Sequence, residues 1–151
     1  MYKEKDKSAE IYLTGVGFQP DMVWIKARSG EYNHQLYDSV RGANEVLETD
    51  GTGIEETRTD GLLSFDTDGF SLGSQIRSNE SVANYVAWNW DMGSSNASNT
   101  DGSITSTVRA NPTYGQSIVS YTGTGSATTV GHGLSSAPEM MIVKALSIIP
   151  I

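Results

Sequence analysis

The sequence predicts an all-β protein, an antiparallel β-sandwich with a jelly-roll or lectin-like topology. Turn signals recur along the chain, and the runs between them are short and rich in β-branched and aromatic residues. The clearest turn signal is Thr-Asp-Gly, in which glycine adopts positive φ at no steric cost and aspartate can bond its own backbone. It occurs four times, at Thr49–Gly51, Thr59–Gly61, Thr67–Gly69 and Thr100–Gly102.

Two strands stand out by their alternation. Asp21–Ala27 alternates two sets of side chains along an apolar run, and Val82–Trp90 places its valines and tryptophans on one face. We place Trp24 and Trp88 in the core, because tryptophan contributes a large buried area among apolar neighbours. The other expected strands are Leu62–Phe65 and Phe70–Leu72, which form a hairpin around Asp66–Gly69, then Ile104–Val108, Ser117–Tyr121 and Met140–Ala145.

One run has the spacing of a helix. Apolar residues in Val40–Leu47 recur at helical intervals and Ser39 is a suitable N-cap, yet Gly42 weakens a helix from inside. A short helix and an irregular loop are the two alternatives. Gly93–Asn99 contains only Gly, Ser, Asn and Ala, which is typical of a flexible connector, and we extend this connector over residues 93–102.

Charge and composition exclude several classes of function. Lysine and arginine number 10 against 18 aspartates and glutamates, a net charge of −8, so the basic surface that nucleic-acid binding needs is missing. The absence of cysteine excludes disulfides, thiolate zinc sites and cysteine nucleophiles. We expect no membrane insertion, since no apolar run approaches roughly 18 residues. We expect no signal peptide, since Met1–Lys7 is charged.

Two segments of the chain repeat each other. At an offset of 118 residues Pro20 falls on Pro138, and Met22–Ala27 falls on Met140–Ala145 with Met, Lys and Ala matched. We interpret the match as a module that begins again near Ser117; two similar strand entries are the alternative. On the first interpretation, residues 1–116 form a β-sandwich module and residues 117–151 are the start of a second, truncated repeat. We expect its strands to pair with the first module, because an unpaired sheet edge is normally covered.

Five segments carry a resemblance to a known family: Gly17–Lys26, Asp38–Ala43, Leu63–Phe70, Tyr85–Trp90 and Thr122–Gly125. Together they resemble a tandemly repeated domain of tail-fibre and virion structural proteins of marine bacteriophages. The resemblance covers most of the chain and implies a structural module in attachment or assembly, without catalytic residues. The family usually enters Gly17 through a Tyr-Thr-Gly strand. Met1–Ser8 takes its place here, so we expect the first module to lack its N-terminal strand.

Three residues are candidates for binding a ligand. Trp90 shares a strand face with Trp88, and exposed aromatic rings on such a face stack on sugar rings, whereas buried ones form a core. Tyr85 lies on the same strand and is the second candidate. His132 lies between two glycines, where its imidazole either binds a metal or a sugar hydroxyl or caps a loop.

Three aspartates in or beside turns are candidate calcium ligands: Asp60, Asp66 and Asp68. Ca²⁺ accepts irregular oxygen cages, but the EF-hand spacing fails, because Ser64 and Gln75 stand where that loop needs carboxylates. Turn chemistry explains the same aspartates without an ion. We expect no cofactor, with Ca²⁺ as the alternative.

No residues indicate catalysis. His34, Asp38 and Ser39 lie close in sequence, but on one strand His34 and Asp38 are too far apart for a catalytic triad. We expect a soluble, non-enzymatic structural module of a phage virion tail. Its expected partners are other virion proteins or a host-surface glycan, and a homo-oligomer stays open. The alternative is a carbohydrate-binding module or a glycan-active enzyme domain.

Overall fold

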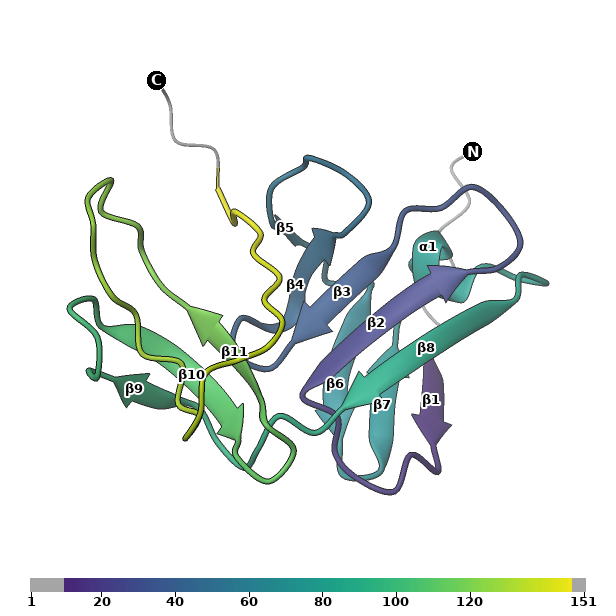
Figure 1. Cartoon of the computed structure of the whole chain (residues 1–151). Coiled ribbons are helices and arrows are strands. Elements are labelled where there is room, and N and C mark those ends of the chain that lie inside the picture. Colours follow the sequence, from purple (N-terminus) through teal and green to yellow (C-terminus); the bar gives the residue numbers. More distant parts are fainter. Residues whose placement is uncertain (1–9, 148–151) are drawn as a thin grey trace.

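The computed structural model describes residues 10–147 and places in them eleven β-strands and one short helix (Figure 1). The strands pair into three antiparallel sheets. Met1–Ser8, on which the expected loss of an N-terminal strand depends, lies outside the described residues. The elements are β1 (Ile11–Thr14), β2 (Met22–Ala27), β3 (Gln35–Asp38), β4 (Gly42–Glu48), β5 (Glu56–Thr57), β6 (Leu62–Asp66), β7 (Gly69–Leu72), α1 (Ile76–Asn79), β8 (Tyr85–Trp90), β9 (Ala97–Asn99), β10 (Ser106–Asn111) and β11 (Gln116–Ser120).

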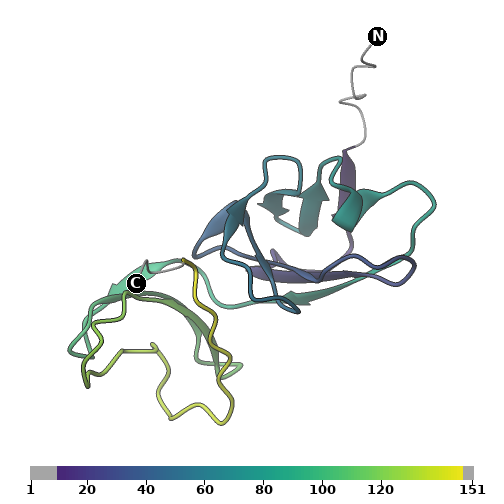
Figure 2. The ribbon, with the colours of Figure 1, turned by 90° about the horizontal axis from the view of Figure 1, so that it is seen from above.

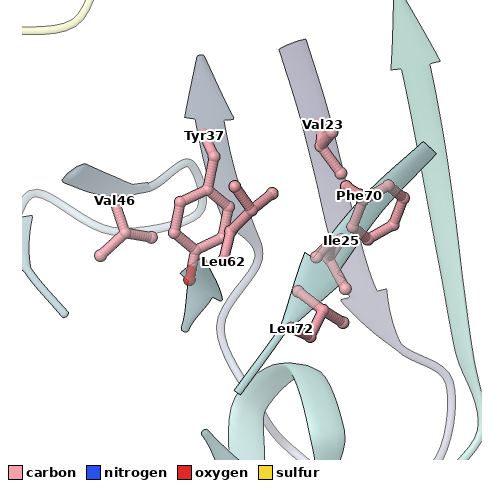
Figure 3. Packing of buried hydrophobic residues seen from close by; sticks show 7 residues of the cluster. All are labelled: Val23, Ile25, Tyr37, Val46, Leu62, Phe70 and Leu72. Carbon is pink, nitrogen blue, oxygen red and sulfur yellow. The ribbon is translucent and has the colours of Figure 1, made fainter. Parts of the chain in front are cut away.

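Two of the sheets pack face to face and form the predicted β-sandwich. The larger sheet has the strand order β5-β4-β3-β2-β8, and the smaller has the order β1-β7-β6. The pattern of β2 shows how the core arises: Val23, Ile25 and Ala27 are buried, whereas the residues between them are partly exposed. Figure 3 shows the core cluster, which consists of Val23, Ile25, Tyr37, Val46, Leu62, Phe70 and Leu72.

The hairpin predicted around Asp66–Gly69 is confirmed as β6 and β7. Asp66 pairs with Gly69 across the turn. A Cβ at Gly69 would lie 1.8 Å from a backbone oxygen of β1, so the close approach of β1 to β7 requires glycine there. The Asp68 carboxylate accepts hydrogen bonds from the N–H groups of Gly15 at 3.0 Å and Gly17 at 2.6 Å. The same turn therefore holds the loop that leads from β1 into β2.

The third sheet lies beside the sandwich (Figure 2) and has the order β11-β10-β9. Residues 129–131 run against the start of β10: Ile104 bridges Val130, and the Ser106 hydroxyl donates to the Gly131 carbonyl at 3.0 Å. The predicted strands Ile104–Val108 and Ser117–Tyr121 correspond to β10 and β11 with shifted ends. The expected boundary between residues 116 and 117 falls inside β11, which pairs with β10 along its whole length. The division of the chain at this boundary stays a prediction.

The run with helical spacing is a strand, so both alternatives for Val40–Leu47 were wrong. This run contributes most of β4, which pairs with β3 on one side and β5 on the other. Gly42 begins the strand at φ 119°, opposite Asp38 and next to a register shift in β3. Valine, asparagine and glycine are weak helix formers, and pairing with two neighbours overrides the spacing.

The strand predicted over Val82–Trp90 begins only at Tyr85, and its two faces are reversed. Val82 is fully exposed with φ 64°, outside the strand. Tyr85 and Ala87 pack against the core, whereas Trp88 is 44% exposed on the outer face. The smaller sheet fills the core with bulky side chains such as Phe70, and β8 places Tyr85 and Ala87 against that core while both of its tryptophans lie on the outer face. Placing Trp24 and Trp88 in the core was therefore wrong.

Two further expectations fail in the second half of the chain. Met140–Ala145 forms no strand and runs as exposed coil. The connector over residues 93–102 contains β9, so only its first part is a link. In residues 10–147 no helix has the length and apolar character that crossing a bilayer requires.

Truncating a core residue of the smaller sheet and a residue on the outer face of the larger sheet should have unequal effects. Phe70→Ala removes a buried ring and should lower the free energy of unfolding by about 3–5 kcal/mol. Trp88→Ala removes a half-exposed ring and should cost only about 1–2 kcal/mol. Urea unfolding followed by circular dichroism measures both. An equal loss at Trp88 would mean that this ring faces the core.

The buried Tyr37 should make the protein sensitive to alkali. Burial raises the pKa of Tyr37 to about 12, although Arg58 and the backbone of Leu62 act in the opposite direction. Between pH 10 and 12 the unfolded chain loses this proton before the folded chain does, so about 2–3 kcal/mol of stability should disappear there. Tyr37→Phe should unfold like the wild type at pH 7 and lack that alkaline loss. Identical pH profiles for both proteins would contradict this.

Candidate functional site

A groove lies where the sandwich meets the third sheet. It consists of two adjoining hollows of about 350 and 530 Å³ that share Phe18 and Asp91 in their walls. We call it the junction groove. Its aromatic lining is Phe18, Trp90 and Tyr114, and its polar lining includes Asn89, Asp91, Asn111 and Gln116.

The three aromatic residues come from three separate elements. Phe18 lies in the loop between β1 and β2, which the Asp68 carboxylate holds in place. Trp90 is the last residue of β8 and stands opposite Met22 of β2. Tyr114 lies in the turn between β10 and β11, where its N–H donates to the Asn111 side chain at 3.3 Å, and its side chain is 67% exposed. The groove therefore depends on how the third sheet docks.

A buried ion pair fixes that docking. Asp21, which precedes β2, is 1% exposed, and its Oδ1 lies 2.6 Å from Nη2 of Arg109 in β10. The other carboxylate oxygen accepts a hydrogen bond from the Met92 N–H at 2.8 Å. Arg109 also donates through Nε to the Gly93 carbonyl at 2.9 Å. The link between β8 and the third sheet is thus bound at Met92 and Gly93.

Burial sets the protonation behaviour of this pair. It raises the pKa of Asp21 above its usual value, although the Met92 N–H and the guanidinium of Arg109 act in the opposite direction. A carboxylate whose pKa is raised by folding contributes less stability as the pH rises through that pKa. The Met92 N–H and Arg109 therefore both help to offset the cost of burying the Asp21 charge.

Two amide side chains complete the docking. Gln116 and Asn111 donate to the Asp91 carbonyl at 2.7 Å and 3.2 Å. They hold both ends of the β10–β11 turn against the end of β8, and so fix Tyr114 near Trp90. A groove with aromatic walls and amide and carboxylate groups offers rings for stacking and polar atoms for hydroxyl groups, the combination that a sugar ring needs.

A second aromatic group lies on the outer face of the larger sheet, next to the groove. Trp24 and Trp88 stand opposite each other on β2 and β8, with ring centroids 5.6 Å apart. The ring of His34 lies 5.7 Å from Trp24. Trp88 and Trp90 share this outer face, because they are two residues apart on one strand. The aromatic surface therefore continues from the groove along β8.

The sequence-predicted ligand residues do not come together. Trp90 lines the junction groove. The Tyr85 hydroxyl donates to the Ile76 carbonyl at 2.7 Å and accepts from the Glu80 N–H at 2.9 Å, so this side chain holds α1. His132 Nδ1 accepts from the Leu134 N–H at 3.1 Å and caps its own loop.

The three candidate calcium ligands are engaged separately. Asp60 accepts from the Gln75 side chain, Asp66 accepts from two serine hydroxyls of its hairpin, and Asp68 binds the β1–β2 loop. Within residues 10–147 no group of three or more His, Cys, Asp or Glu side chains is placed to hold a metal ion. In this structure these aspartates accept hydrogen bonds that stabilise turns and loops.

Asp38 and His34 also have separate contacts. Asp38 lies 2.6 Å from Nε of Arg41 and accepts from the backbone N–H groups of Val40 and Arg41. His34 packs its ring on Trp24.

Sequence reasoning missed Phe18, Tyr114 and the Asp21–Arg109 pair. Phe18 and Tyr114 each stand beside a glycine outside the predicted strands, and a large aromatic residue in such a loop is the signal that was available. The ion pair joins positions 21 and 109, and no local pattern links them.

The fold and the groove define an all-β sandwich domain with an appended three-stranded sheet and an aromatic groove between them. The chain belongs to the family described as a domain of unknown function, DUF7483, whose match spans residues 2–149. Neither the curated proteins nor the solved structures contain a significant match to the chain.

Removing the charge of Arg109 should lower the stability of the protein. Arg109→Met leaves the Asp21 carboxylate buried without its partner and should cost about 3–5 kcal/mol at pH 7. The loss should shrink as the pH falls, because protonation then removes the buried charge. Arg28→Met, the same change at an exposed arginine, is the control and should have little effect. Urea unfolding at pH 7 and pH 4 tests this; a loss independent of pH would show that the charge of Asp21 is not its cause.

Proposed function

We propose that this domain is a non-enzymatic attachment module of a phage virion or tail-fibre structural protein, and that it binds a glycan through the junction groove. The observation that carries the proposal is the convergence of Phe18, Trp90 and Tyr114 with amide side chains in one groove at the surface. Sugar rings stack on such side chains, and amides bond their hydroxyl groups. The virion setting is supported by the sequence resemblance.

The state of the acidic groups supports binding without turnover. Glycoside hydrolysis needs two available carboxyl groups on either side of the scissile bond. Asp21 has one oxygen on Arg109 and the other on the Met92 N–H, and Asp91 accepts from the Gly93 N–H at 3.0 Å. Both carboxylates of the groove therefore have structural partners.

Glycan-array binding tests the proposal. Trp90→Ala and Tyr114→Ala should each weaken binding about tenfold or more, since each removes a stacking ring. Tyr12→Ala, an exposed aromatic residue on β1 outside the groove, is the matched control and should bind like the wild type.

The contrary outcomes are distinct. Absence of binding across the array, or an equal loss in Tyr12→Ala, would overturn the assignment of the groove. Release of new reducing ends from a bound glycan would overturn the non-enzymatic part of the proposal.

A further inference from the structure

An apolar segment is left exposed in the second half of the chain. Met140, Met141, Ile142 and Val143 are each 76–81% exposed. Scattered exposed apolar residues are ordinary on a protein surface, but a run of four consecutive ones is typical of an interaction surface. We call Met140–Ala145 the donor segment.

The donor segment has the residue pattern of a central strand. It repeats β2 at an offset of 118 residues, with Met, Lys and Ala matched and apolar residues between them. In the sandwich, β2 pairs with β8 over six residues, from Met22 opposite Trp90 to Ala27 opposite Tyr85. A segment with this pattern is therefore suited to pair with a strand like β8.

Hydrogen bonds place the donor segment beside one edge of the larger sheet. Lys144 Nζ donates to the Gly51 carbonyl at 2.6 Å, and the Leu146 carbonyl accepts from the Glu55 N–H at 3.0 Å. Glu55 directly precedes β5, the edge strand on that side. β8 is the opposite edge, four strand spacings or about 19 Å away. While these bonds hold, the segment cannot reach β8 of its own chain.

β8 offers a free edge that accepts a strand. It pairs only with β2 among the described residues, and its sequence Tyr-Val-Ala-Trp-Asn-Trp contains no charge and no proline. Sheet edges are normally protected by such residues. β8 is also the longest edge strand of the three sheets, since β1, β5, β6, β9 and β11 are shorter.

We propose that the donor segment of one copy adds to the free edge of β8 in a second copy as an antiparallel strand. In the register of β2, Ile142 stands opposite Trp88 and Ala145 opposite Tyr85. Ile142 then covers the outer face of Trp88, which is 44% exposed, and Val143 lies beside Ala87 on the core side.

This contact joins copies head to tail. The donor lies at the β5 edge and the acceptor is the β8 edge, so the two surfaces differ and each copy offers one of each. Such a heterologous contact extends into a ring or a linear chain of copies rather than stopping at a two-fold dimer. The inference rests on the donor segment and β8, and it holds whether or not the junction groove binds a glycan.

Sedimentation velocity over a concentration series tests the assembly. The full chain should sediment faster as its concentration rises, and Ile142→Glu should abolish that rise while its melting temperature stays that of the wild-type monomer, because Ile142 is exposed there. Ile76→Glu, the same change at a half-exposed isoleucine of α1, is the control and should assemble like the wild type. A wild-type chain that stays monomeric, or an Ile142→Glu variant that assembles normally, overturns the proposal.

Cross-linking tests the register. The chain contains no cysteine, so a disulfide between two single variants reports only the designed pair. A mixture of Ile142→Cys and Trp88→Cys chains should form a heterodimeric disulfide under mild oxidation. Ile142→Cys mixed with Tyr12→Cys should form little, because Tyr12 lies on β1 of the smaller sheet. Equal cross-linking in both mixtures overturns the assignment of β8 as the acceptor.

Discussion

The junction between the two parts of this molecule depends on the buried ion pair of Asp21 and Arg109. It connects the strand entry of β2 with the centre of the third sheet, and neither charge can lose the other without remaining uncompensated in a dry environment. The crossing is tight as well: a Cβ at Gly93 would lie 2.2 Å from the Ala110 carbonyl oxygen. The two bodies therefore dock in one arrangement, and the junction groove takes its shape from it.

The same pair determines what the groove can recognise. Arg109 is the arginine in its wall, and its guanidinium is occupied by Asp21 and by the Gly93 carbonyl. No free cation of the lining is left to attract an acidic ligand. The aromatic rings and the Asn89 side chain remain, in a chain whose net charge is −8. Recognition by this groove would thus rest on shape and on hydrogen bonds to neutral groups, which agrees with a proposed sugar ligand.

The sequence was informative where structure is local and less so where it is not. The β6–β7 hairpin was predictable, because Asp-Gly defines its turn within four residues. β4 was not, because its spacing suits a helix and only its pairing with β3 and β5 makes it a strand. Alternation in β8 revealed two faces but not which one is inward, since that depends on the bulk that Phe70 and its neighbours bring from the other sheet. Trp90, a candidate from the sequence, lines the groove, whereas Phe18 and Tyr114 come from loops that no strand pattern links to it.

The outward placement of tryptophan has a practical meaning. The chain has three tryptophans, Trp24, Trp88 and Trp90, and all three belong to the outer face of β2 and β8. Intrinsic fluorescence of this protein is therefore a signal from one surface, with the hydrophobic core almost silent. Tryptophan emission would respond to a molecule bound on that surface without any attached dye. A spectral change during denaturation would report when that surface becomes exposed to water, rather than when the core opens.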